Sequence, residues 1–84
     1  MTESRRLARA QAADLVFLGD TLLVIHECDK GRGVTAARVT RELMSDPDII
    51  EAAVRKLRRR GYLVRVGDSA RHRLTLLGRT WLGE

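Results

Sequence analysis

Apolar residues recur every three or four positions along much of this 84-residue chain, which predicts a mainly helical domain. Residues 4–18 contain neither glycine nor proline and carry a partly broken apolar stripe, so we expect an N-terminal helix there. Gly19 and Asp20 indicate a boundary, because Asp20 can cap a second helix. Leu22 and Ile25 would line one face of that helix. The alternative is a single continuous helix kinked at Gly19.

Two further helices are predicted after a glycine-rich turn. The "GRG" at 31–33 ends the second helix, since glycine is common just beyond a helix C-terminus. Thr35 is a suitable cap for the next helix, "AARVTRELM". "SDPD" then opens a helix over about 47–60, with Ser45 or Asp46 as cap and proline in the first turn. The predicted buried stripe of this last helix is Ile50, Val54 and Leu57.

The C-terminal part of the chain changes from helical spacing to strand-like sequence. "YLVRV" (62–66) and "RHRLTLL" (71–77) are rich in β-branched and aliphatic residues, with apolar alternation at Leu74 and Leu76. The intervening "GDSA" is a turn cluster, so the two segments are predicted to form a β-hairpin. Val34 is a lone apolar position that could pair as a minimal strand. The closing "LLGRTWL" is expected to be a short helical or extended segment.

Length and composition exclude several classes of protein. A chain of this size is expected to be one domain over residues 1–84. No window approaches the roughly 20 apolar residues that span a bilayer, and no signal peptide begins the chain, so a cytoplasmic protein without membrane contact is expected. The single cysteine, Cys28, leaves no intramolecular disulfide and no set of zinc ligands. A buried thiol is the expected state of Cys28, and a redox switch is the alternative.

The sequence also lacks the motifs of catalytic sites. It contains no CxxC, HExxH or glycine-rich phosphate loop. His26 and Cys28 are two positions apart on one helix, so they do not face each other. We therefore expect no enzyme activity, no catalytic residue, no bound metal and no cofactor.

The charge of the chain is concentrated in its C-terminal part. The net charge is +5, but residues 55–79 hold nine basic side chains and one acidic one, a local charge of +8. Residues 1–54 hold seven basic and nine acidic side chains, a local charge of −2. Such a cationic region is an electrostatic footprint for a polyanion. A solvated basic face is the alternative interpretation.

Three segments resemble winged helix-turn-helix regulators. "VTAARVTREL" looks like the LT-x-x-x-LA-x-x-L helix of these domains, and "VRKLRRRGYLVRV" looks like the segment that ends their recognition helix and begins the wing. "LTLLGRTWL" is similar to the segment that follows the wing in the MarR and PadR-like families of bacterial regulators. The resemblance covers about residues 20–82. It implies a mainly α fold with a small β-hairpin (α+β), a winged helix-turn-helix preceded by the extra N-terminal helix at about 4–18.

The same resemblance implies a function and its partners. It suggests a small transcriptional regulator that binds double-stranded DNA. MarR-type proteins carry long terminal helices that dimerise and shape an effector pocket, whereas this chain offers only residues 4–18 and a short segment after Leu77. We therefore expect a minimal DNA-binding module without a small-molecule sensor, forming a homodimer through its N-terminal helix.

Charge and resemblance together select the candidate DNA-binding residues. The helix at about 47–60 would read an operator, and the basic wing at 65–73 would follow the phosphate backbone or minor groove. Further arginines lie off the apolar stripes of the two packed helices and could bind phosphates. Solvated charges and an inert basic loop are the alternatives. The basic candidates are Arg38, Arg41, Arg55, Arg58, Arg59, Arg65, Arg71, His72 and Arg73.

Asp48 and Glu51 depart from the family pattern, because they put carboxylates where a recognition helix reads base edges. If this helix enters the major groove, the two acids would accept hydrogen bonds from cytosine amino groups. If it does not enter DNA, the domain would be a protein-binding adaptor with a protein partner. Both interpretations remain open at the level of sequence.

Overall fold

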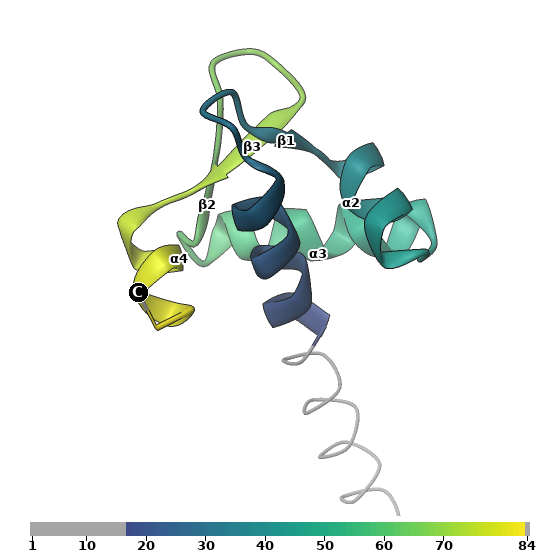
Figure 1. Cartoon of the computed structure of the whole chain (residues 1–84), viewed down its shortest axis with the longest axis horizontal. Helices are drawn as coiled ribbons and strands as arrows, with labels where there is room; N and C mark the ends of the chain where they lie inside the picture. The colour runs from purple at the N-terminus through teal and green to yellow at the C-terminus, as the bar shows by residue number, and fades with distance from the viewer. Residues whose placement is uncertain (1–16, 84) are drawn as a thin grey trace, which may run out of the picture.

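The computed structural model describes residues 17–83, which form a cluster of helices beside a small antiparallel sheet (Figure 1). The sheet order is β1-β3-β2, so the first short strand pairs with the hairpin. This order of elements is a winged helix-turn-helix and confirms the predicted fold class. After a helix over residues 17–28, the elements are β1 (Val34–Thr35), α2 (Ala36–Leu43), α3 (Pro47–Arg59), β2 (Leu63–Arg65), β3 (Arg71–Leu74) and α4 (Leu76–Trp81).

The boundary predicted at Gly19 and Asp20 is wrong. Residues 17–28 form one helix without a break, and Asp20 is an exposed residue inside it rather than a cap. The remainder of the helix predicted at 4–18 lies outside the described residues. Among the residues that the structure describes, no helix is long and apolar enough to cross a membrane.

The helix continues through Gly19 because its buried face does. Leu18, Leu22 and Ile25 are at most 4% exposed and lie on one stripe that crosses the glycine. Gly19 also lies against the ring of Trp81, since a Cβ at this position would be 3.2 Å from two of its ring atoms. Burial of the stripe outweighs the roughly 1 kcal/mol that glycine costs inside a helix.

The starts of α2 and α3 follow the predicted capping chemistry. The Thr35 side chain accepts a hydrogen bond from the backbone N–H of Arg38, at 3.1 Å. The Asp46 side chain accepts one from the backbone N–H of Asp48, at 2.8 Å, with proline at the first helical position. Gly61, with a φ of +82°, follows the end of α3. These local signals set the length of α3 and hence which side chains it presents.

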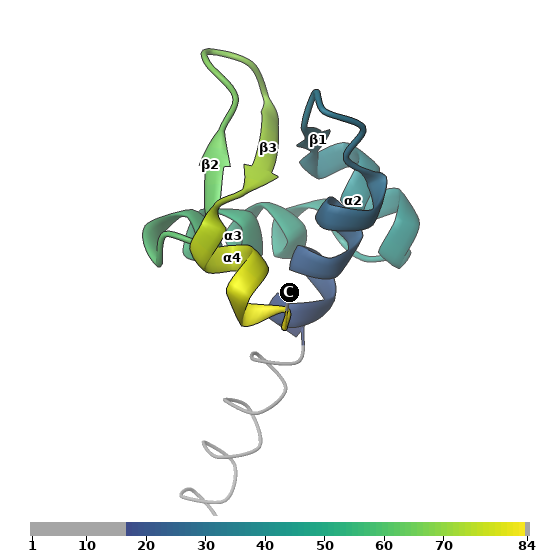
Figure 2. The same ribbon diagram turned by 60° about the vertical axis from the view of Figure 1, so that its left-hand side comes forward.

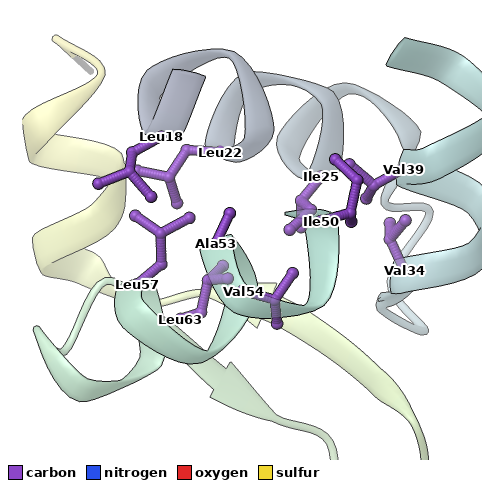
Figure 3. Packing of buried hydrophobic residues seen from close by; sticks show 10 residues of the cluster. All are labelled: Leu18, Leu22, Ile25, Val34, Val39, Ile50, Ala53, Val54, Leu57 and Leu63. Carbon is purple, nitrogen blue, oxygen red and sulfur yellow. The ribbon is translucent and has the colours of Figure 1, made fainter. Parts of the chain in front are cut away.

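The core lies between the helix at 17–28 and the inner face of α3 (Figure 3). Leu22 and Ile50 are completely buried, and Leu57 is 1% exposed, so the predicted stripe of α3 is confirmed. Each such side chain contributes about 1.5–3 kcal/mol through burial. The opposite face of α3 is left in solvent. The buried apolar residues are Leu18, Leu22, Ile25, Val34, Val39, Ile50, Ala53, Val54, Leu57 and Leu63.

The sheet joins the wing to the start of α2. Val34 pairs with His72, which confirms the predicted minimal strand, and Arg65 pairs with His72 from the other side. Figure 2 shows β2 and β3 extending away from the helices as a projecting hairpin. Because neighbouring residues of a strand point to opposite faces, His72 and the flanking arginines of β3 lie on different sides of this hairpin.

The predicted strand at 71–77 is too long. Strand β3 ends at Leu74, and Thr75 caps α4 by accepting a hydrogen bond from the backbone N–H of Gly78 at 3.1 Å. Leu76, predicted to alternate with Leu74 in this strand, is 75% exposed on the helix. Gly78 allows the backbone of Tyr62 to approach so closely that a Cβ would collide with its carbonyl oxygen. Capping and this close approach therefore favour the short helix.

Candidate nucleic-acid interface

A shallow hollow of about 290 Å³ lies between the outer face of α3 and the wing. We call it the α3–wing groove. It is lined by Ala36 at the start of α2, by Glu51, Val54, Arg55 and Arg58 of α3, and by Arg65, Ala70 and His72 of the hairpin. The groove therefore combines side chains from the two segments that the sequence predicted to bind an operator.

The groove is electropositive. Arg55, Arg58 and Arg65 are exposed and face a single carboxylate, that of Glu51. Within the described part of the chain, none of these three arginines forms an ion pair. Their positive charges are therefore available to an anion. Arg55 and Arg58 reach the groove because they fall between the buried positions of α3, as the helical period requires.

His72 forms the floor of this groove, where the sequence analysis had placed it only within the basic wing. The residue is only 6% exposed. Its Nε2 lies 3.3 Å from Nη1 of Arg58. A guanidinium can only donate hydrogen bonds, so we assign Nε2 as the acceptor and place the proton of the neutral ring on Nδ1. Burial puts the pKa of His72 below its ordinary value, and the nearby Arg58 and Arg65 lower it further.

The neutral imidazole leaves one polar atom unsatisfied. Among the buried side-chain nitrogen and oxygen atoms of residues 17–83, only Nδ1 of His72 lacks a hydrogen-bond partner. The Ala70 backbone raises the pKa of His72 by less than burial lowers it, and the geometry of the site leaves Nδ1 without a hydrogen bond. An unsatisfied buried N–H costs about 1–3 kcal/mol. The stability of the fold therefore does not account for a histidine at this position.

Arg73 points away from the groove and holds the wing to the loop before β1. Its Nε donates to Oδ2 of Asp29 at 2.7 Å. The other carboxylate oxygen, Oδ1, accepts from the backbone N–H groups of Gly31, at 2.8 Å, and Gly33, at 2.9 Å. Burial raises the pKa of Asp29, but the hydrogen bonds from Arg73, Gly33 and Gly31 outweigh that effect and lower it overall.

Asp29 was not among the residues selected from the sequence. A signal was present, because aspartate ahead of glycines commonly accepts hydrogen bonds from the backbone of its own turn. The hydrogen-bond partner of Oδ2 is Arg73, 44 positions away in the chain, so no local sequence pattern predicts that contact.

A second basic cluster lies at the start of α2. Arg71 donates through Nη1 to the carbonyl oxygen of Gly33 at 3.1 Å, and with Arg38 and Arg41 it lines a hollow of about 180 Å³. Arg38 is paired with Glu42 at 2.9 Å, and both side chains are nearly half exposed, so the pair adds little stability. This cluster is separate from the α3–wing groove, although the residues of the two regions were selected from the sequence as one set of DNA-binding candidates.

Gly33 brings the wing close to this cluster. Its φ is +86°, and a Cβ there would lie 2.9 Å from Cγ2 of Val66 and 3.1 Å from the carbonyl oxygen of His72.

Cys28, expected to be buried, is half-buried in the hollow lined by Arg38, Arg41 and Arg71. In the described residues no group of three histidine, cysteine, aspartate or glutamate side chains could hold a metal ion.

The remaining candidates lie along the exposed face of α3. Asp48 is in its first turn, where a carboxylate suits the positive end of the helix dipole. Glu51 follows one turn later in the groove, and Arg59 is exposed at the C-terminal end but does not line the groove. The charge along this face thus changes from acidic to basic in the direction of the wing.

Comparison with known proteins supports the fold. No family model matches this chain, and no curated protein sequence matches it either. Among solved structures, the chain is similar to the crystal structure of the MarR family protein Rv2887 of Mycobacterium tuberculosis, with a TM-score of 0.61 and 22% sequence identity. The similarity covers 99% of this chain and 70% of the other. The fold is thus the winged helix-turn-helix found in a MarR family protein.

Proposed function

We propose that this protein is a transcriptional regulator that binds double-stranded DNA. Helix α3 would enter the major groove, and the wing would follow the neighbouring phosphate backbone. The protein would act in the cytoplasm, where it would meet its operator, and would need neither a cofactor nor an enzymatic step.

The observation that carries this proposal is the charge of the α3–wing groove. Arginines from two separate elements, Arg55 and Arg58 on α3 and Arg65 on β2, converge there without carboxylate partners among residues 17–83. Unpaired cations that repel one another are costly to gather unless an anion binds between them. A guanidinium also suits phosphate oxygens, because it offers two parallel N–H donors.

Self-association is a further part of the proposal. Dimers with two-fold symmetry are common readers of palindromic operators. Helix α4 leaves three apolar side chains substantially exposed: Leu76 (75%), Leu77 (53%) and Trp81 (44%). These residues could extend a dimer interface whose main element is the N-terminal helix expected at 4–18.

The proposal is tested by measuring affinity for duplex DNA at several salt concentrations. If five or six phosphates are neutralised per protomer, a plot of log K against log salt should have a slope of about −5. Arg55→Ala with Arg65→Ala should reduce the magnitude of that slope by about 2. Arg79→Ala is the matched control, because it removes an exposed arginine of α4 that does not line the groove. No binding at low salt, or a flat salt dependence, would refute the proposal.

Asp48 and Glu51 favour a second candidate function, a protein-binding adaptor. Both are exposed on the N-terminal half of α3, where they repel phosphate. In DNA recognition, Asp48→Ala and Glu51→Ala should strengthen non-specific binding and relax the preference for cytosine at one or two positions. In the adaptor, the same substitutions should leave DNA selection unchanged and abolish capture of a protein partner.

A further inference from the structure

The floor of the α3–wing groove is a neutral imidazole in a basic surrounding. Helix α3 presents Glu51, Arg55 and Arg58 to the groove that contains His72, and β2 presents Arg65. On its third side, His72 pairs with Val34 of β1, which has no titratable group. The flanking residues of its own strand, Arg71 and Arg73, point to the opposite face.

His72 makes one side-chain hydrogen bond in this setting, the contact of Nε2 with Nη1 of Arg58. This contact links the recognition helix to the central strand of the wing. A neutral acceptor at this position orients the guanidinium without cancelling its charge, whereas a carboxylate would neutralise it. A long arginine side chain that is already ordered also loses less conformational entropy when it binds.

We propose that His72 is a positioning residue, which holds the guanidinium of Arg58 in the α3–wing groove so that Arg58 can bind a phosphate of the DNA backbone. This inference rests on the proposed DNA-binding function. It gives a reason for a histidine whose unsatisfied Nδ1 makes it unfavourable for stability. A leucine would fill the floor of the groove without burying an N–H.

The first test needs no DNA. The ¹⁵N chemical shifts of the two imidazole nitrogens in the intact protein report which of them carries the proton. At neutral pH, His72 should carry it on Nδ1, with an unprotonated Nε2, and Arg58→Ala should shift the Nε2 resonance. A ring protonated on Nε2 would overturn the inference, since that nitrogen could not accept a hydrogen bond from Arg58.

The second test compares two replacements of His72 in DNA binding. His72→Gln can present an acceptor near the Nε2 position, so it should retain wild-type affinity. His72→Leu should resemble Arg58→Ala and lose one phosphate contact, which lowers the magnitude of the salt slope by about 0.9. Its deficit relative to the wild type should then shrink about 3.5-fold between 50 and 200 mM salt. Adding His72→Leu to Arg58→Ala should cause no further loss.

Stability separates positioning from a purely structural role. His72→Leu should unfold at the same denaturant concentration as the wild type or a higher one, because it removes an unsatisfied buried N–H. Weaker DNA binding without loss of stability, rescued by His72→Gln, supports positioning. A wild-type salt slope for His72→Leu would overturn the inference, and so would a binding deficit in His72→Gln equal to that of His72→Leu.

The two proposals fail in different ways. If the wild-type protein binds no duplex DNA, the proposed function fails and the phosphate role of Arg58 fails with it. If the wild type binds DNA with the expected salt dependence while His72→Leu binds equally well, the proposed function stands and only the role of His72 is overturned.

Discussion

Asp29→Ala should destabilise the protein by about 2–3 kcal/mol. The substitution removes a carboxylate that accepts hydrogen bonds from the backbone N–H groups of Gly31 and Gly33 and from Nε of Arg73. The two backbone bonds are worth about 1 kcal/mol each. The ion pair adds no more than about 1 kcal/mol, because the Arg73 side chain is 50% exposed.

Two matched variants divide this loss into its parts. Asp29→Asn keeps an oxygen that can accept from both glycines and loses only the ion pair, so it should cost about 1 kcal/mol. Arg73→Ala should cost a similar amount. The double variant Asp29→Ala with Arg73→Ala should cost no more than Asp29→Ala by itself, because both substitutions remove the same ion pair. Urea denaturation at neutral pH measures the free energy of unfolding of these four variants and of the wild type.

The result bears on DNA binding as well as on stability. If Arg73 anchors the wing through Asp29 instead of contacting DNA, Arg73→Ala should leave the salt slope of DNA binding nearly unchanged, whereas Arg65→Ala should reduce its magnitude by about 0.9. An Asp29→Ala protein that loses less than about 0.5 kcal/mol, or an Arg73→Ala protein that loses as much as Asp29→Ala, would refute this account of the loop.

Three further predictions follow from burial, backbone conformation and protonation. Leu57→Ala should cost about 2–5 kcal/mol in urea denaturation because the side chain is 1% exposed, whereas Met44→Ala, 93% exposed, should stay within about 0.5 kcal/mol. Gly33→Ala should destabilise more than Gly31→Ala: both have positive φ, but only Gly33 has close neighbours, and equal losses would contradict this. Because the pKa of His72 is lowered on folding, the native state binds fewer protons than the unfolded chain, so stability should fall as the pH drops through about 6.5. His72→Gln should remove that loss, while the loss due to the lowered pKa of Asp29 should begin only near pH 3.8.

The sequence determined the features that depend on neighbouring residues. Thr35 and Asp46 cap their helices as predicted, because a side-chain oxygen and a backbone N–H two or three positions away meet whatever the rest of the chain does. The buried stripe of α3 was equally predictable from its spacing, and so was the hairpin from its turn residues. Together with the resemblance to winged helix regulators, these local signals were sufficient for the fold.

Tertiary structure decided what happens where distant segments meet. The local sequence at Gly19 is typical of a helix end, but in the fold Trp81 packs against Gly19 and the helix continues. The local sequence at Leu76 is typical of a strand, but in the fold Gly78 lets α4 approach Tyr62. Figure 2 shows α4 beside the helix at 17–28, and there Trp81 lies against Gly19, 62 positions earlier in the chain.

The candidate site shows the same division. Charge alone predicted a basic wing, but it could not tell His72, buried beside Arg58, from Arg73, which pairs with Asp29 on the other face. One step along β3 reverses the direction of a side chain, and the elements packed on each face decide its partner. The number of arginines is therefore a property of the sequence. Their availability to a phosphate depends on tertiary contacts, such as that of Arg58 with His72, 14 positions away, and that of Arg73 with Asp29, 44 positions away.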